Sequence, residues 1–412
     1  MKPKGLPFSI ALIVAVFALS TAVIPAFAAS EEKVLLSFTG DDGLAPYAGL
    51  ALDSAGNLYG TTYGGGAYGY GCVFQLVPGT QGKWTETLLY SFNFGADGVL
   101  PYAGLVLDHE GNLYGTTKAG GDFGYGTVFE LIRGQSGTWT ETVLHSFDGN
   151  DGLSPVAGVV FDKSGNLYGT TLYGGDFGYG NVFQLTPDAN GNWTEMTLYS
   201  LAGNGTDGSY PYGGVVFDAA GNLYGTTYSG GAYNGGTVFQ LTPAGNGNWT
   251  ETVLHSLGKN KDGINPYDGV VIDAKGNLYG TANSGGSHDR GAVFRLTPTG
   301  NGHWTETILH SFDLQKDASR PYGSLVFGVS GALYGTGYSG GLQGYGAIFR
   351  LTPAENGKWT GKVLYSFNLS DGDGPYSSLI LDHRGNLFGT TQYGGGDGCG
   401  GLGCGVVFEI HP

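Results

Sequence analysis

Charged residues are scarce in this chain, and positive ones are the scarcest. Lys, Arg, Asp and Glu make up 13% of the 412 residues, with 18 basic side chains against 34 acidic ones and a net charge of −16. Nucleic acids and anionic membranes are bound through clusters of Lys and Arg, so neither is expected as a partner. Low charge together with 80 Gly and 16 Pro is typical of low complexity, but an aromatic content of 13% argues against disorder. A regular repeat would explain both.

Long hydrophobic runs are absent after residue 24. The single run, residues 10–24, follows Lys2 and Lys4 and precedes Pro25 and an Ala-Phe-Ala sequence at residues 26–28. This order is typical of a secretory signal, with an uncleaved membrane anchor as the alternative. We therefore expect a signal peptide at residues 1–28 and one mature domain at residues 29–412. That domain is expected to be a monomer without a membrane span, secreted to the periplasm or the medium.

Sustained helical periodicity is also absent, which disfavours repeat folds that contain helices. Instead, an Asn-Leu-Tyr-Gly-Thr-Thr segment recurs with small changes at intervals of 54 to 56 residues. Its copies begin at Asn57, Asn112, Asn166, Asn222, Asn277, Ala332 and Asn386. A Trp-Thr pair recurs at Trp84, Trp139, Trp193, Trp249, Trp304 and Trp359. The chain thus holds seven copies of the first block and six of the second.

Each unit is predicted to form four short strands. In the second unit we expect strands at residues 104–108, 113–117, 127–131 and 139–147. A tight turn joins the first two, and a Gly-rich loop joins the second to the third. Four antiparallel strands per repeat at this spacing are typical of propeller blades.

The two ends of the chain complement each other. The seventh unit stops after its third strand, whereas residues 34–38 (Val-Leu-Leu-Ser-Phe) match residues 143–147, the end of a fourth strand. We therefore predict an all-β fold, a seven-bladed β-propeller with four antiparallel strands per blade. The N-terminal strand completes the last blade, which removes the open sheet edges.

Three sequence blocks follow one another in each unit: Gly-Asn-Leu-Tyr-Gly-Thr-Thr, Gly-x-Val-Phe-x-Leu-x-Pro and Trp-Thr-Glu-x-x-Leu. In this order, over about residues 34 to 410, they resemble the Gloeo/Verruco (GloVer) tandem repeats of exported bacterial proteins. The resemblance implies a surface or extracellular repeat protein without an assigned activity. Members often end in a sorting or anchoring tail, and residues 409–412 do not look like one.

The loops from strand four to strand one and from strand two to strand three share one face of a propeller, so their repeated side chains are candidate ligand-binding residues. The four-to-one loops supply Asp42, Asp97, Asp151, Asp207, Asp262, Asp317 and Asp371, each followed four residues later by Pro. A Tyr follows that Pro in six units: Tyr47, Tyr102, Tyr212, Tyr267, Tyr322 and Tyr376. The Gly-rich loops add Tyr125 and Tyr179, and the third unit has Val156 in place of the Tyr. We expect a crown of carboxylates and phenols around the channel mouth, a surface suited to sugars. The alternative role for the Asp residues is ordinary turn chemistry.

Metal and catalytic motifs are sparse. No cofactor is expected, and a weakly held Ca²⁺ is the alternative, because only Asp41-Asp42 and Asp371-Gly372-Asp373 concentrate carboxylates. Three histidines stand in fourth strands at a position that is Tyr in other units, and three such strands cannot share one metal: His145, His255 and His310. Neither Gly-x-Ser-x-Gly nor His-Glu-x-x-His occurs, so no catalytic residue is predicted.

Three cysteines imply a disulfide in an oxidising compartment. Cys399 and Cys404 lie in the last Gly-rich loop, and Cys72 begins the third strand of the first unit. The local pair would constrain one loop. Cys72 with either partner would instead join the first blade to the last across the closure.

A protein that binds rather than catalyses fits this pattern best, because an enzyme needs a cluster specific to one unit whereas this chain repeats itself. We expect it to bind polysaccharide, glycoconjugate or a surface protein through the aromatic and Asp loop face. The alternative is a propeller hydrolase or lyase that acts on polysaccharide at the channel mouth, since a ring brings distant carboxylates together.

Overall fold

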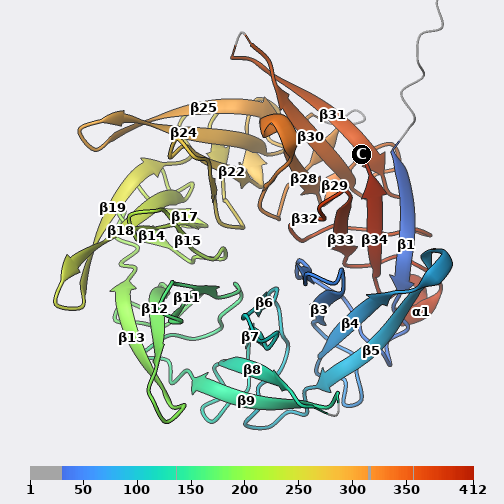
Figure 1. Cartoon of the computed structure of the whole chain (residues 1–412). Coiled ribbons are helices and arrows are strands. Elements are labelled where there is room, and N and C mark those ends of the chain that lie inside the picture. The colour runs from blue at the N-terminus through green and yellow to red at the C-terminus, as the bar shows by residue number, and fades with distance from the viewer. Residues whose placement is uncertain (1–29, 136, 314–316, 356) are drawn as a thin grey trace, which may run out of the picture.

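The computed structural model describes residues 30–135, 137–313, 317–355 and 357–412, and the predicted signal peptide lies outside this part. The described chain forms seven four-stranded antiparallel sheets arranged radially around a central axis (Figure 1). The predicted seven-bladed β-propeller is confirmed. Within the described residues, no helix is both long enough and apolar enough to cross a membrane.

The blades are built from strands of increasing length from the axis outward. The first strands are β2 (Ala51–Leu52), β6 (Val106–Leu107), β10 (Val160–Phe161), β15 (Val216–Phe217), β21 (Val271–Ile272), β27 (Val326–Phe327) and β32 (Ile380–Leu381). The second strands are β3 (Leu58–Thr62), β7 (Leu113–Thr117), β11 (Leu167–Thr171), β16 (Leu223–Thr227), β22 (Leu278–Ala282), β28 (Leu333–Gly337) and β33 (Leu387–Thr391).

The third strands are β4 (Cys72–Pro78), β8 (Thr127–Arg133), β12 (Asn181–Pro187), β18 (Thr237–Gly245), β24 (Ala292–Gly300), β30 (Ala347–Pro353) and β34 (Val406–His411). The fourth, outermost strands are β5 (Trp84–Ser91), β9 (Trp139–Ser146), β13 (Trp193–Ser200), β19 (Asn248–Ser256), β25 (His303–Ser311), β31 (Trp359–Ser366) and, for blade 7, β1 (Glu31–Ser37). Single turns of helix are η1 (Thr80–Gly82), η2 (Val329–Gly331) and α1 (Gly398–Gly401).

The ring closes through the N-terminal strand. β1 pairs antiparallel with β34, from Glu31 opposite His411 to Ser37 opposite Val406. In Figure 1 the blue β1 lies beside the red β34 at the outer edge of blade 7. The predicted closure is therefore confirmed, and blade 7 is assembled from both ends of the chain.

The first strands are shorter than predicted, with two residues each rather than five. Around the axis the backbones approach one another closely. A Cβ added to Gly104 would lie 3.0 Å from the carbonyl oxygen of Gly49 in the preceding blade, and one on Gly269 would lie 2.7 Å from that of Gly214. A side chain at either position would crowd the backbone of the neighbouring blade, so glycine is favoured there.

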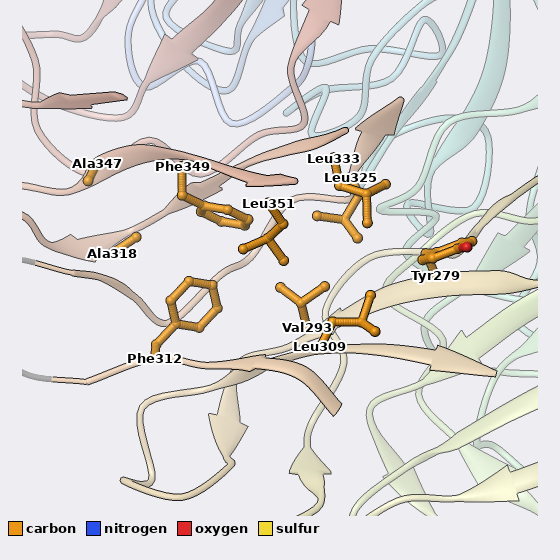
Figure 2. Close-up of a cluster of buried hydrophobic side chains, with 10 residues drawn as sticks. All are labelled: Tyr279, Val293, Leu309, Phe312, Ala318, Leu325, Leu333, Ala347, Phe349 and Leu351. Atoms are coloured by element: carbon orange, nitrogen blue, oxygen red, sulfur yellow. The ribbon is translucent and has the colours of Figure 1, made fainter. Parts of the chain in front are cut away.

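The core lies between blades rather than inside one. The second strands are buried along their whole length, because each blade is covered on both faces by its neighbours. Figure 2 shows the interface of blades 5 and 6, where Phe312 and Val293 of one blade face Phe349 and Leu351 of the next. Every blade thus depends on two neighbours for burial, which is why a closed ring is the stable arrangement.

The six Trp residues join the outer parts of neighbouring blades. Each packs edge-to-face on an aromatic residue in the second strand of the preceding blade, as Trp139 does on Tyr59 with 6.4 Å between ring centroids. Trp84 packs in the same way on Phe388 across the closure. The structure therefore gives these residues a packing role.

The turn between the first and second strands explains the repeated Asp-x-x-Gly-Asn-Leu-Tyr segment. In blade 2, Asp108 accepts hydrogen bonds from the backbone of Glu110 and Asn112, the Asn112 amide and the Tyr114 hydroxyl. Gly111 has a φ of +87°, a conformation that favours glycine. One carboxylate therefore holds the whole hairpin.

Candidate functional site

The four-to-one and two-to-three loops pair with each other on one face of the ring. Blades 1, 2, 3 and 7 join them through single bridges, such as Leu44 to Gly64. The other three blades form two-residue ladders: β14 (Gly208–Ser209) with β17 (Ser229–Gly230), β20 (Gly263–Ile264) with β23 (Ser284–Gly285), and β26 (Ala318–Ser319) with β29 (Ser339–Gly340). This pairing holds the loops that surround the end of the central channel, which we term the channel mouth.

Six tyrosines from six blades converge at the channel mouth and form one tyrosine cluster: Tyr47, Tyr102, Tyr212, Tyr267, Tyr322 and Tyr376. Tyr47 stacks on Tyr102 with ring centroids 4.8 Å apart, and Tyr322 stacks on Tyr376 at 4.5 Å. The Tyr102 hydroxyl donates to that of Tyr376 at 2.7 Å, although 274 residues separate them. The rings are half-buried and contact one another, so they form a compact aromatic layer rather than an open crown.

A second layer of side chains surrounds this cluster. Tyr63, Tyr228 and Tyr338 each contact two of the six rings at centroid distances of 5.2 to 6.2 Å. The Lys118 ammonium lies 5.7 Å from the Tyr102 ring centroid, and the Gln392 amide donates to the Tyr47 hydroxyl. The sequence analysis missed this layer. Its signal was present, because Tyr63, Lys118 and Tyr228 directly follow the second strand of their blades.

A cavity of about 290 Å³ lies at the tyrosine cluster and extends into the channel. Blades 1 to 3 give it an apolar wall that includes Leu50, Leu105 and Val159. A polar wall from blades 5 and 7 carries Asp268 and Ser378, and the Asp268 carboxylate accepts hydrogen bonds from Ser378 Oγ and the Ser324 amide, both at 2.8 Å. Asp268 is specific to one blade, since the other units have Ala, Gly or Ser at its position, whereas Ser378 has an equivalent in Ser324 of blade 6.

The gap in the tyrosine set falls in blade 3. Val156 occupies the place of a tyrosine there and lines the cavity. Because valine is smaller, the aromatic layer is incomplete on that side. The gap in the layer therefore lies between Tyr102 of blade 2 and Tyr212 of blade 4.

The seven Asp residues of the four-to-one loops do not form part of this cluster, so the predicted mixed crown is wrong in that respect. Each Asp accepts a hydrogen bond from a backbone amide of its own loop, as Asp42 does from Thr39 and Asp371 from Asn368. Six of them also contact the Tyr or His of the fourth strand that precedes the loop: Asp97, Asp151, Asp207, Asp262, Asp317 and Asp371. The Asp side chains therefore fix loops to outer strands.

We term the interface between the outer strands of two neighbouring blades a seam. In most seams one of these Asp residues lies near a Glu from the Trp-Thr-Glu block of the next blade. Desolvation, with the nearby Asp97 carboxylate adding to it, raises the pKa of Glu141 to about 8. In the same way burial beside Asp42 raises the pKa of Glu86 to about 7, and burial beside Asp207 raises that of Glu251 to about 7. The seams thus hold carboxylates that ionise at neutral pH and above.

The Gly-rich loops present further aromatic residues outside the channel mouth. Tyr125 and Tyr179 lie on these loops rather than in the tyrosine cluster, and Tyr179 contacts Tyr210 at a centroid distance of 5.7 Å. Tyr68, Phe123 and Phe177 are exposed on the tips of the same loops. They form a rim separate from the central cluster.

The three cysteines divide into one disulfide and one free thiol. Cys399 and Cys404 are bonded within the last Gly-rich loop, with Cα atoms 5.3 Å apart. Cys72 is buried and unpaired, with its sulfur 3.1 Å from Thr62 Oγ1. The pairing across the closure is therefore not formed, because Cys399 and Cys404 bond each other and leave Cys72 without a partner cysteine.

Comparison with known protein families identifies the family to which these repeats belong. The model of the Gloeobacter/Verrucomicrobia repeat matches residues 16–201, 133–313 and 272–412, which together cover most of the chain. The chain belongs to this family. The repeats of this Gloeobacter/Verrucomicrobia chain are therefore the propeller blades described above, and the last match includes most of blade 7.

Solved structures resemble this chain at low sequence identity. A proposed 6-phosphogluconolactonase from Bacteroides uniformis is 14% identical with a TM-score of 0.51, over 81% of this chain and 88% of that one. A protein described as an oxidoreductase (glucose dehydrogenase) from Thermus thermophilus is 16% identical with a TM-score of 0.40, over 93% and 100% of the chains. At such an identity the likeness to the Bacteroides uniformis structure shows the fold alone. A search of curated proteins found no match.

Proposed function

We propose that this Gloeobacter/Verrucomicrobia repeat protein is an exported, non-enzymatic protein that binds carbohydrate at the channel mouth. The observation that carries the proposal is the tyrosine cluster over a cavity with one apolar and one polar wall. Aromatic rings stack on the C–H faces of sugars, and a few fixed polar groups orient the hydroxyls. The ligand class is polysaccharide or a glycoconjugate of the cell envelope, with a surface protein as the other partner.

The polar wall supports a ligand with hydroxyl groups. Asp268 already accepts three hydrogen bonds, from Gly269, Ser324 and Ser378, so its orientation is fixed before a ligand arrives. A carboxylate held in this way retains lone pairs for a sugar hydroxyl. Lys118, placed over Tyr63 and Tyr102, is a donor at the edge of the same surface.

Export is part of the proposal. The Cys399–Cys404 disulfide suits an oxidising compartment such as the periplasm or the medium. This agrees with the signal peptide expected at residues 1–28.

The hydrolase alternative requires a pair of acidic groups at the channel mouth, because glycoside hydrolysis usually uses two carboxyl groups. Among the described residues that line the cavity, Asp268 is the one carboxylate. The paired carboxylates of this protein lie instead in the seams, where nearly every blade repeats them. This distribution favours binding over glycoside hydrolysis.

A glycan array with the chain from residue 29 onward tests the proposal, run with and without a chelator. Binding to a defined set of glycans is expected in both conditions. Tyr102→Ala and Tyr267→Ala should each reduce the signal at least tenfold, because each removes a stacking face of the cluster. Tyr68→Ala, on an exposed loop tip, is the matched control and should bind like the unmodified chain.

Thermal melts separate loss of binding from loss of fold. If folded Tyr267→Ala binds normally while Tyr68→Ala does not, the site lies on the rim and the proposal for the channel mouth is wrong. An array without any signal rejects the carbohydrate class and leaves the surface protein as partner.

A further inference from the structure

One seam differs from the others in the side chains that it brings together. His255, near the end of β19 in blade 4, meets Asp262 of the following loop and Glu306 of β25 in blade 5. Their potential ligand atoms all lie within 4.8 Å of one another, and within the described residues this is the one group of three or more His, Cys, Asp or Glu with such spacing.

The geometry of this group suits a small divalent cation. His255 Nε2 lies 3.1 Å from Asp262 Oδ2 and 3.8 Å from Glu306 Oε2. Ligands that each lie about 2.1 Å from a tetrahedral ion are about 3.4 Å apart, which falls between these two distances. The second oxygen of Asp262 accepts the Gly263 amide at 2.8 Å, so the backbone orients the first toward the group.

The three side chains are largely buried, and one carboxylate oxygen among them lacks a hydrogen-bond partner. The Asp262 and Glu306 side chains are only 4% and 16% exposed. Glu306 Oε1 is fully enclosed and has no hydrogen-bond partner. Within the part of the chain that the structure describes, no Lys or Arg forms an ion pair with either carboxylate. Buried carboxylates normally have a cation or a full set of donors nearby. Asp262 is hydrogen-bonded by His255 and the Gly263 amide, whereas Glu306 Oε1 lacks a donor, as the equivalent Glu does in four other seams, so the histidine distinguishes this one.

We propose that His255, Asp262 and Glu306 form a binding site for a divalent transition-metal ion of the zinc class between blades 4 and 5. An imidazole with two carboxylates is a ligand set for Zn²⁺ and its first-row neighbours, whereas Ca²⁺ and Mg²⁺ favour oxygen ligands throughout. Three protein ligands leave one position for solvent. The ion would link the outer strands of two blades, so the site is independent of the proposed carbohydrate surface.

The other seams explain why the site occurs once. Three have Tyr in place of His, and in each the hydroxyl donates to the Asp: Tyr90, Tyr199 and Tyr365. The seam with Asp42 and Glu86 has Leu36 at this position. His145 pairs with Asp151 at 2.8 Å, but the facing Glu195 binds Thr197 through Oε1. His310 pairs with Asp317 at 2.8 Å, but that seam has Gly361 at the position that Glu306 occupies in the seam of His255. The repeat therefore supplies matched controls within one molecule.

Calorimetric titration of the chelator-treated chain (residues 29–412) with ZnCl₂ tests the site. We expect one high-affinity Zn²⁺ per chain and a higher melting temperature with Zn²⁺, with CaCl₂ giving neither. His255→Tyr installs the residue that three other seams use, so it should fold normally while weakening Zn²⁺ binding at least tenfold. Glu306→Gln keeps the shape of the side chain and should weaken binding to a similar extent.

The control variants are His145→Tyr and His310→Tyr, which remove a histidine from an incomplete seam. Each should keep the Zn²⁺ affinity within twofold of the unmodified chain. The proposal is overturned if the unmodified chain binds no stoichiometric Zn²⁺. It is also overturned if folded His255→Tyr binds Zn²⁺ as tightly as the unmodified chain, or if His310→Tyr loses the same affinity.

Discussion

Replacing Glu141 with Gln should stabilise the protein, and only at high pH. Glu141 of blade 2 faces Asp97 of blade 1, and the Tyr90 hydroxyl donates to that Asp at 2.8 Å. Burial, reinforced by Asp97, raises the pKa of Glu141 from 4.5 to about 8. The folded state therefore holds a proton that the unfolded chain releases, and the free energy of unfolding falls as pH rises from about 5 to 8.

The size of the effect follows from the same pKa. Taken at face value, the difference between pKa values of 4.5 and about 8 corresponds to a change of about 5 kcal/mol in the free energy of unfolding. The carboxyl group is only part-buried, and solvent screening reduces such an interaction, so we expect ~1–2 kcal/mol. The glutamine amide of the variant cannot ionise, so Glu141→Gln keeps this amount at pH 9, whereas at pH 5 the two proteins should be nearly equal.

Urea denaturation at pH 5, 7 and 9 measures the difference directly. Glu110→Gln, on an exposed hairpin turn, is the control for removing one negative charge and should change stability equally at each pH. A difference between Glu141→Gln and the unmodified protein that stays constant from pH 5 to 9 would refute the reasoning. So would destabilisation by Glu141→Gln at pH 9.

Three further outcomes are expected. Deleting residues 1–38 removes β1 and exposes the edge of β34, so melting should occur at lower temperature with self-association in size-exclusion chromatography; an unchanged melt would contradict closure by this strand. Cys72 should not react with a thiol reagent in the native protein but should react in urea, because burial raises the pKa of its thiol to about 12; rapid native labelling would show that the blade opens. Asp108→Ala removes an acceptor of four hydrogen bonds and should cost ~2–3 kcal/mol by urea denaturation, whereas Glu110→Ala in the same turn should have little effect.

The fold was predictable because the information that determines it is local and repeated. The strands around Asn112-Leu113-Tyr114 and the turn that Asp108 holds recur at a constant spacing. The absence of a seventh Trp-Thr block, together with residues 34–38, was enough to predict ring closure. The first strands were misjudged in length, with two residues instead of five, and the close approach of Gly104 to Gly49 was not visible in the sequence because these residues are 55 positions apart.

The candidate site was predictable only in part. The Asp-x-x-x-Pro-Tyr pattern correctly placed six tyrosines on one face, but it could not show which way each side chain points. Asp97 and Tyr102 are five residues apart in one loop, yet the first binds Tyr90 on the outer strand and the second stacks at the axis. The sequence analysis therefore placed the Asp residues wrongly in the crown and overlooked Tyr63 and Lys118.

By itself the sequence determined the number of blades, their strand order and the closure, because repeat length, strand period and turn residues act within a few tens of residues. Only the tertiary structure decided which side chains meet. The hydroxyl of Tyr102 reaches that of Tyr376, and His255 meets Glu306 of the next blade, through the angle at which blades pack around the axis. That angle is a property of the closed ring, since every blade is held by two neighbours and none of these contacts exists in a single repeat.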